Sequence, residues 1–428
     1  MEEMIRTALG KTALVFGLAL LLQHAASAQQ DSADHKVLTV AAYPSIDAVI
    51  KASIPAWKKI HPDVDIKIVS RQITDHHTAM TTALATSGNL PDVMALEVAY
   101  VGRFAQGGAL EDLSRPPFDI KRFQSRFVPY ALQQATNGNG QIVAVPTDIG
   151  PGTLLYRKDL LDKAKVTEAD LTRSWDSYIA AGVKIKAATG AYLLADAFNV
   201  KEIVLRSGIK PGDGLYFDSQ SNVLVTSPRF ELAFELAREV RQKGLDARAS
   251  QWSSDWTEGL KRGMIATQMG GAWLVGHLDN WLAPNTRGLW RAAPLPNGSH
   301  AAYGGSFYAI PRHSSPENKA LAWEFIKLMT LDRSIQLAAF ESQDAFPALL
   351  ETYDAPFFEQ PIPFLGGQVA RADWREAARH IEAISVHKQD PFADEVVNTE
   401  LNKVLDHGKD IKSALTDAQH LLEQRARR

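Results

Sequence analysis

The sequence predicts an α/β protein made of two lobes that are joined by strands crossing between them, with a cleft where the lobes face each other. Three observations support this prediction. Strand-like and helix-like segments alternate from Val37 onward. The 428 residues are enough for two sizeable cores. The chain has no repeats and no low-complexity linker, so crossing strands rather than a tether must join the lobes.

The start of the chain has the composition of a secretory signal peptide. Two basic residues, Arg6 and Lys11, precede an unbroken apolar run over residues 13–22, and small residues lead up to Ala28. The run is too short for a membrane span, which needs about 20 apolar residues, and no later segment approaches that length. We therefore expect cleavage near Ala28 and export to the periplasm.

Composition narrows the possible partners. The chain has no cysteine, so disulfides, thiolate metal sites and a lipid-anchoring cysteine are not expected. The net charge is −3, and removal of the leader leaves it unchanged because the leader holds two bases and two acids. A balanced charge argues against nucleic acid or an anionic membrane as the main partner. We expect a freely diffusing monomer with no cofactor, no metal and no direct membrane anchor.

The N-terminal part of the chain is predicted to alternate strands with helices. Apolar residues recur at helical spacing from Ile46 to Ile60, and Pro55 within this run predicts a kink or a fresh start. Val64 and Ile66 begin an alternating pattern that is typical of a strand. The expected elements are strands over 37–41, 64–68 and 93–96 and helices over 46–60 and 75–85.

The first crossing between the lobes is predicted in the stretch VAVPTDIGPGTLLYRKDLL, residues 143–161. A short apolar strand ends at Pro146, and a Gly-Pro-Gly break follows at residues 150–152. A second strand over 153–156 then leads into a helix that opens at Arg157. A strand that stops, becomes flexible and restarts suits a passage between two lobes.

This stretch resembles the first interdomain crossing of the family 1 extracellular solute-binding proteins, the receptors of sugar ABC importers. In that family a proline and an acidic or polar residue precede a Leu-x-Tyr-Asn-Lys-Asp-Leu run, and here Arg157 stands where Asn is usual. Further matching blocks follow in family order over nearly the whole mature chain, which makes the set far more specific than any one block. They are PDVMALE at 91–97, GALEDL at 108–113, EGLKRGMIA at 258–266, GGAW at 270–273, GGS at 304–306 and SPENKA at 315–320.

The resemblance implies a type II periplasmic binding protein fold with a ligand cleft between its lobes. It implies a periplasmic receptor that captures a carbohydrate, preferably an oligosaccharide, by lobe closure and delivers it to the membrane permease subunits of an ABC transporter. The lobes are expected to divide the chain after residue 28 as follows: 29–148 and 304–347 in the N-terminal lobe, 149–303 in the C-terminal lobe, and 348–428 as helices of the C-terminal lobe.

Candidate ligand-binding residues follow the predicted strands of the first lobe. A sugar in water needs planar hydrogen-bonding groups at its rim and aromatic rings against its faces. Ligands of open α/β sheets meet the loops at the carboxyl ends of the strands. Glu97 directly follows an apolar strand, although it could instead be a solvated cap of the next helix. The candidates here are Tyr43, Gln72, Glu97, Tyr100 and Asp148.

In the second lobe, Trp273 matches the tryptophan of the family's Gly-x-Trp block, and the resemblance implies that it stacks on the sugar. A core tryptophan is the alternative interpretation. Three further candidates follow a strand predicted over 191–194, namely Asp196, Phe198 and Glu202. Those at the second crossing are Tyr303, Gly305 and Ser306.

Other signals favour ordinary structural roles or leave alternatives open. Adjacent residues on a helix do not face one ligand, so His76 and His77 indicate a solvated helix start rather than a metal site. No His-Glu-x-x-His, P-loop or Gly-x-Ser-x-Gly pattern occurs. The alternatives are a secreted glycosidase or lyase that uses Glu97 and Asp148 as its two carboxylates, or a receptor that feeds a sensor kinase.

Overall fold

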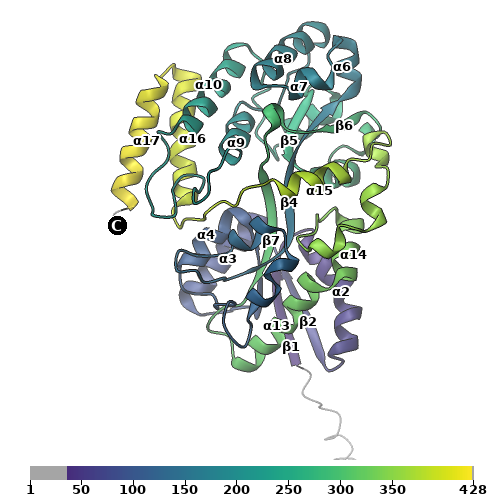
Figure 1. Cartoon of the computed structure of the whole chain (residues 1–428), viewed down its shortest axis with the longest axis vertical. Coiled ribbons are helices and arrows are strands. Elements are labelled where there is room, and N and C mark those ends of the chain that lie inside the picture. The colour runs from purple at the N-terminus through teal and green to yellow at the C-terminus, as the bar shows by residue number, and fades with distance from the viewer. Residues whose placement is uncertain (1–35, 427–428) are drawn as a thin grey trace, which may run out of the picture.

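The computed structural model describes residues 36–426, so the predicted signal peptide lies outside the described residues. Figure 1 shows two lobes, one above the other, with two strands running from one to the other. These strands are β4 (Val145–Arg157) and β7 (Ala302–Ala309). The predicted α/β fold of two lobes joined by crossing strands is confirmed.

One mixed sheet runs through both lobes. Its strand order is β2-β1-β3-β7-β4-β5, with β6 also paired to β4. The first half of β4 pairs with β7 and the second half pairs with β5 and β6, so β4 belongs to both lobes. The remaining strands are β1 (Lys36–Ala42), β2 (Val64–Ser70), β3 (Val93–Glu97), β5 (Thr267–Gly271) and β6 (Trp290–Ala293).

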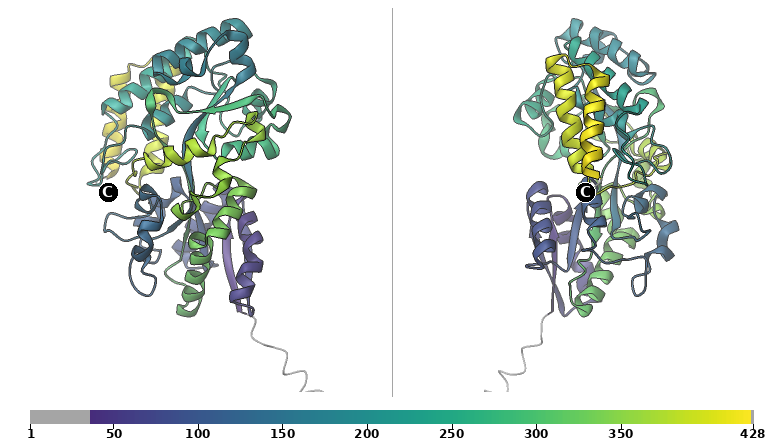
Figure 2. Two further views of the ribbon diagram at one scale, coloured as in Figure 1. Left: turned by 45° about the vertical axis from the view of Figure 1, so that its right-hand side comes forward. Right: turned by 90° about the vertical axis from the view of Figure 1, so that its left-hand side faces the viewer.

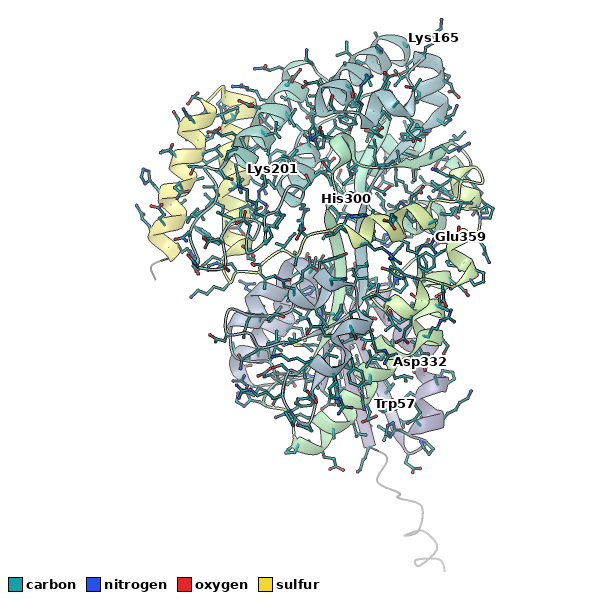
Figure 3. The ribbon with its side chains drawn as sticks, in the orientation of Figure 1. Trp57, Lys165, Lys201, His300, Asp332 and Glu359 are labelled. Carbon is teal, nitrogen blue, oxygen red and sulfur yellow. The ribbon has the colours of Figure 1, made fainter. Side chains whose placement is uncertain are left out.

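The lobe that contains β1 to β3, here called the N-terminal lobe, has helices on both faces of its sheet (Figures 1 and 2). Leu38 and Val40 face one core and Ala41 faces the other, because successive strand side chains point to opposite faces. Figure 3 places the buried Trp57 in this lobe, where its Nε1 donates to Val64 O at 3.0 Å. The helices are α2 (Ile46–Ile60), α3 (Ile73–Thr86), α4 (Val98–Gln106), α5 (Pro129–Gln133), α13 (Pro316–Leu331) and α14 (Arg333–Gln343).

The other lobe, here called the C-terminal lobe, is mainly helical. Its α16 and α17 form a pair against the outer side of the lobe (Figure 2). The strand predicted over 191–194 is wrong, since only isolated bridges of Tyr192 and Leu194 form there. The helices are α6 (Lys158–Ala164), α7 (Glu168–Thr172), α8 (Trp175–Thr189), α9 (Phe198–Arg206), α10 (Pro228–Gln242), α11 (Ser254–Arg262), α12 (Leu274–His277), α15 (Arg371–Arg379), α16 (Asp390–His407) and α17 (Ile411–Ala426).

Two local predictions about proline and glycine need correction. Helix α2 runs through Pro55 as one element, without the predicted fresh start. Strand β4 does not stop at the Gly-Pro-Gly break but continues through it, with irregular pairing between Ile149 and Pro151. The glycine at 150 serves close approach rather than flexibility, because a Cβ there would lie 1.9 Å from the carbonyl oxygen of Tyr303.

The chain also passes between the lobes after α14. Leu349 pairs with Phe127, and Asp354 forms an ion pair with Arg333 at 2.7 Å, so this segment packs against the N-terminal lobe. We propose that the return segment of that lobe extends past residue 347 to about residue 354, with the other predicted boundaries unchanged.

A further contact between the lobes lies along the segment between α15 and α16, which runs across the molecule at the boundary between the lobes in Figure 1. A Cβ at Gly102 of α4 would lie 2.9 Å from the carbonyl oxygen of His387. Across residues 36–426, no helix combines the length and the apolar composition that a membrane crossing requires.

We expect Gly150→Ala to destabilise the protein by about 1–3 kcal/mol, because the added methyl group would force β4 away from β7. Thermal unfolding of the purified protein measures the change. Gly138→Ala is the matched control, since a Cβ there meets no atom within 4 Å. Equal melting temperatures for the two variants would contradict close strand approach as the reason for glycine at 150.

Candidate functional site

A cavity of about 780 Å³ lies between the two lobes at the crossing strands. Residues of both lobes line it, and the crossing strand β7 contributes several of them. It brings together eight of the predicted site residues: Tyr43, Gln72, Glu97, Asp148, Trp273, Tyr303, Gly305 and Ser306.

A row of polar side chains crosses the sheet at one wall of the cavity. Ser306 on β7 is paired with Glu97 on β3 on one side and with Asp148 on β4 on the other. Directly opposed residues of antiparallel strands point to the same face, with their Cβ atoms about 5 Å apart. Three consecutive strands therefore present a carboxyl, a hydroxyl and a carboxyl side by side.

The environment of these carboxyl groups favours their protonated forms. Burial raises the pKa of Glu97 to about 6, although a hydrogen bond from Ala99 N and the charge of Arg206 oppose the rise. Burial also raises the pKa of Asp148 to about 7; hydrogen bonds from Ser306 oppose this rise, and the charge of Glu97 adds to it. Near neutral pH these groups can therefore donate as well as accept hydrogen bonds.

Indole rings from the C-terminal lobe line the cavity as well. Trp252 lies nearly parallel to Trp273, with ring centroids 6.0 Å apart, and nearly parallel to Trp281, with centroids 6.3 Å apart. His277 contacts all three rings. The side chains of Trp252 and Trp281 are 52% and 58% exposed. We call Trp252, Trp273 and Trp281 the indole wall.

The sequence builds the indole wall from two segments. Residues 273, 277 and 281 recur at a spacing of four across α12 and the π-helical turn Leu278–Leu282, which places their side chains on one face. Trp252 comes from the loop before α11, where its backbone has φ of +71°. A positive φ is rare for a bulky residue and often marks a functional position.

Two glycines make room for Trp273, one from the GGAW block and one from the predicted second crossing. Its Nε1 donates to Tyr303 O at 2.8 Å. A Cβ at Gly271 would lie 2.2 Å from that nitrogen, and a Cβ at Gly304 would lie 2.7 Å from it. Gly304 also has a φ of +94°, so it meets both a steric and a conformational requirement for glycine.

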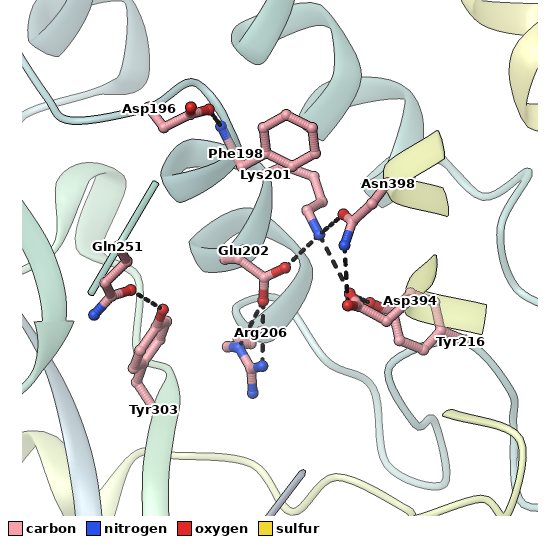
Figure 4. A network of polar contacts seen from close by, with 10 residues as sticks. All are labelled: Asp196, Phe198, Lys201, Glu202, Arg206, Tyr216, Gln251, Tyr303, Asp394 and Asn398. Carbon is pink, nitrogen blue, oxygen red and sulfur yellow. Dashed lines mark hydrogen bonds and ion pairs between the residues drawn. The ribbon is translucent and has the colours of Figure 1, made fainter. Parts of the chain in front are cut away.

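A network of charged side chains supports the C-terminal wall of the cavity (Figure 4). Arg206 lines the cavity, lies over the ring of Tyr303 at 5.1 Å and pairs with Glu202 at 3.2 Å. Glu202 also pairs with the fully buried Lys201. Burial by itself would raise the pKa of Glu202, but the charges of Lys201 and Arg206 outweigh it and lower the pKa to about 2. Lys201 further contacts Asp394 at 3.5 Å.

Four predicted site residues lie outside the cavity lining. Glu202 pairs with Arg206 but does not itself line the cavity. Phe198 lies beside Lys201, whose Nζ is 5.9 Å from the centroid of its ring. Asp196 accepts a hydrogen bond from Phe198 N at 3.0 Å, at the start of α9. Tyr100 stacks on a histidine of α3 instead. Asp196, Phe198 and Glu202 were expected in the cavity because they follow the strand predicted over 191–194. That strand does not form, so it does not direct these side chains into the cavity.

The histidine pair also differs from prediction. His76 and His77 are buried, with exposed fractions of 0% and 1%, so the expected solvated helix start is wrong. Within residues 36–426, no group of three or more His, Asp or Glu side chains is arranged to hold a metal ion.

Several lining residues were not predicted. The spacing of four that joins Trp273, His277 and Trp281 was visible in the sequence and could have indicated a shared face. No sequence signal identifies Trp252, because its loop has no periodicity and its place depends on the fold. The lining residues missed include Arg206, Gln251, Trp252, His277, Trp281 and Gln343.

Comparison with known families gives a match over most of the chain. The model for the bacterial extracellular solute-binding protein family matches residues 52–363. The lactose-binding protein of Rhizobium radiobacter is 26% identical over 345 residues, covering 76% of this chain and 78% of that protein. The arabinooligosaccharide-binding protein of Halalkalibacterium halodurans is 23% identical over 331 residues, covering 73% and 71%.

Solved structures share the fold. A family 1 extracellular solute-binding protein superposes with a TM-score of 0.79 at 22% identity, covering 91% of this chain and all of that one. The ABC transporter-associated binding protein of B. animalis subsp. lactis Bl-04, in complex with β-1,6-galactobiose, gives a TM-score of 0.75 at 24% identity, covering 92% and 98%.

We expect Asp148→Asn to change how stability depends on pH. A carboxyl whose pKa is raised in the folded state binds its proton more tightly there than in the unfolded chain, so its contribution to stability falls as the pH rises from about 4 to about 7. The asparagine has no such dependence. The melting temperature of the variant relative to wild type should therefore rise between about pH 5 and about pH 8. A constant difference across this range would contradict the raised pKa.

Proposed function

The chain belongs to the bacterial extracellular solute-binding protein family, and on this basis we propose that it is the carbohydrate-binding receptor of an ABC importer. The observation that carries the proposal is that the indole wall and the polar row of Glu97, Ser306 and Asp148 line the same cavity. Indole faces suit the C–H patches of a sugar ring, and carboxyl groups suit its hydroxyls. The relatives named for lactose and for arabinooligosaccharides support the same ligand class.

An oligosaccharide fits this site better than a single sugar. The cavity of about 780 Å³ falls in the upper part of the range that small-molecule sites occupy. The indole wall extends over three rings, with successive centroids about 6 Å apart, so it offers more than one sugar ring a surface to pack against. Glu97, Asp148 and Arg206 would bind hydroxyls along the rim.

The mechanism we propose is closure of the lobes about β4 and β7. A ligand that contacts Glu97 on one lobe and Trp252 on the other makes all of its contacts only when the lobes meet. Such a ligand shifts the population toward the closed form, because it binds that form more tightly. The permease subunits in the membrane would then recognise the closed form.

A receptor with this role acts outside the cytoplasmic membrane, after export. We propose that the leader is cleaved near Ala28, that the mature protein diffuses in the periplasm as a monomer, and that no chemistry is done on the ligand. The relatives are named as binding proteins rather than enzymes, which favours this reading of the two cavity carboxyls over hydrolysis.

Ligand binding and closure are tested together. We expect one or more of lactose, maltotriose, arabinotriose and β-1,6-galactobiose to raise the melting temperature, because a ligand that binds only the native state stabilises it. Solution X-ray scattering should then give a smaller radius of gyration at saturation, with the saccharide recovered unchanged. Binding without compaction would contradict the hinge mechanism, and conversion of the saccharide would assign the protein to the enzymes.

We expect Trp252→Ala to weaken saccharide binding by about tenfold, because a stacked ring contributes about 0.5–1.5 kcal/mol beyond its buried area. Calorimetric titration measures the affinity. The folded structure should persist, because half of this side chain is exposed. Leu421→Ala on α17 is the control, since Leu421 is 47% exposed and lies outside the cavity lining. Unchanged affinity in Trp252→Ala would remove Trp252 from the binding surface.

A further inference from the structure

Strand β3 has a gap in its hydrogen bonding close to the cavity. Its parallel pairing with β1 ends at Ala41 and Met94. In a parallel ladder, the C=O of one residue and the N–H of the residue two positions later face the same neighbour. Ala95 O and Glu97 N are therefore the next groups on that side of β3, and β1 does not reach them. Buried backbone groups of this kind need other partners.

The adjacent His76 and His77 of α3 supply those partners. His76 Nε2 lies 2.7 Å from Ala95 O, and His77 Nε2 lies 3.0 Å from Glu97 N. Two consecutive side chains thus replace the peptide groups of a missing strand. Neither residue lines the cavity, so neither belongs to the ligand contacts proposed above.

The partners of His77 determine its protonation state. Its Nδ1 lies 2.6 Å from Ile73 O, and a carbonyl oxygen can only accept, so Nδ1 carries the proton. Its Nε2 accepts a hydrogen bond from the N–H of Glu97, so Nε2 carries no proton. The imidazole is therefore the neutral Nδ1–H tautomer. Burial lowers the pKa of His77 to about 4, which agrees with this form. His76 must have the opposite tautomer, because its Nε2 donates to Ala95 O.

The peptide that His77 holds is the one that carries a cavity carboxyl. Glu97 is the last residue of β3 and the N-cap of α4, where its Oε2 accepts from Ala99 N at 2.8 Å. The ring of His77 stacks on that of Tyr100, one turn into α4, with centroids 3.8 Å apart and planes 10° apart. His77 therefore connects α3, the end of β3 and the start of α4 at the point where Glu97 enters the cavity.

We propose that His77 is a positioning residue for ligand binding, whose neutral imidazole holds the Glu97 peptide and so fixes the Glu97 carboxyl at the cavity wall. This proposal rests on the proposed function, because it assigns an effect on saccharide affinity. His77 acts through Glu97 and makes no ligand contact itself.

The test compares His77→Phe with His76→Phe. Both substitutions keep a planar ring and remove one bond to the end of β3, but only the first releases Glu97. The ligand panel is the four saccharides named under the proposed function. We expect His77→Phe to weaken binding of a panel saccharide by about tenfold or more, and His76→Phe to weaken it by less than about threefold. This difference should hold even if the two variants lose similar amounts of stability. Amide hydrogen exchange at Glu97 should accelerate in His77→Phe alone.

Two further measurements separate positioning from a general structural role. In a Glu97→Gln background, His77→Phe should change affinity by less than about threefold, because the group that it positions is already altered. Nitrogen NMR of the wild type should find His77 protonated at Nδ1 and bare at Nε2. Unchanged affinity in His77→Phe, additive effects in the double variant, or a proton on Nε2 would overturn the proposal. If no panel saccharide binds the wild type, the proposed ligand class is wrong, while the tautomer and the amide exchange still decide whether His77 holds Glu97.

Discussion

The close pairing of β4 with β7 is the constraint on which the rest of the structure depends. Both strands pass from one lobe to the other, and β4 pairs with β7 in one lobe and with β5 and β6 in the other. At Gly150 the two backbones approach so closely that no side chain fits between them. Ser306 then lies between Glu97 and Asp148, and Tyr303 O lies within reach of Trp273. The same pair of strands thus positions both the polar row and Trp273 of the indole wall.

The two walls of the cavity are held in different ways. On the N-terminal side, backbone and histidine contacts hold Glu97 in a buried setting that raises its pKa. On the C-terminal side, Arg206 is held by Glu202, which Lys201 neutralises in turn. Isolated buried charges are costly, and ion pairing offsets this cost on the C-terminal side. On the N-terminal side the cost appears as the raised pKa values of Glu97 and Asp148, about 6 and about 7. The cavity can therefore offer both donors and acceptors before any ligand enters.

The sequence predicted the cavity well where a residue follows a strand that really forms. Tyr43 and Glu97 lie where the strand ends placed them, and Asp148 lines the cavity from within β4 at the predicted crossing. Asp196 and its neighbours were expected at the end of a strand over 191–194, and they lie elsewhere because that apolar stretch makes only isolated bridges. A short apolar run by itself cannot distinguish a strand from a buried extended segment, since a strand also needs a free partner edge.

The sequence by itself determined the two-lobed α/β fold, the crossing at residues 143–161 and the carboxyl and tryptophan candidates, because ordered local blocks and strand periodicity are properties of nearby residues. Only the tertiary structure decided that Trp252 joins the two tryptophans at 273 and 281, and what the histidine pair does. Trp252 reaches the other indoles from a distant loop, and His77 finds Glu97 twenty residues away because β1 ends before the last residues of β3. Such contacts depend on where strands end and loops return, which no local pattern of residues records.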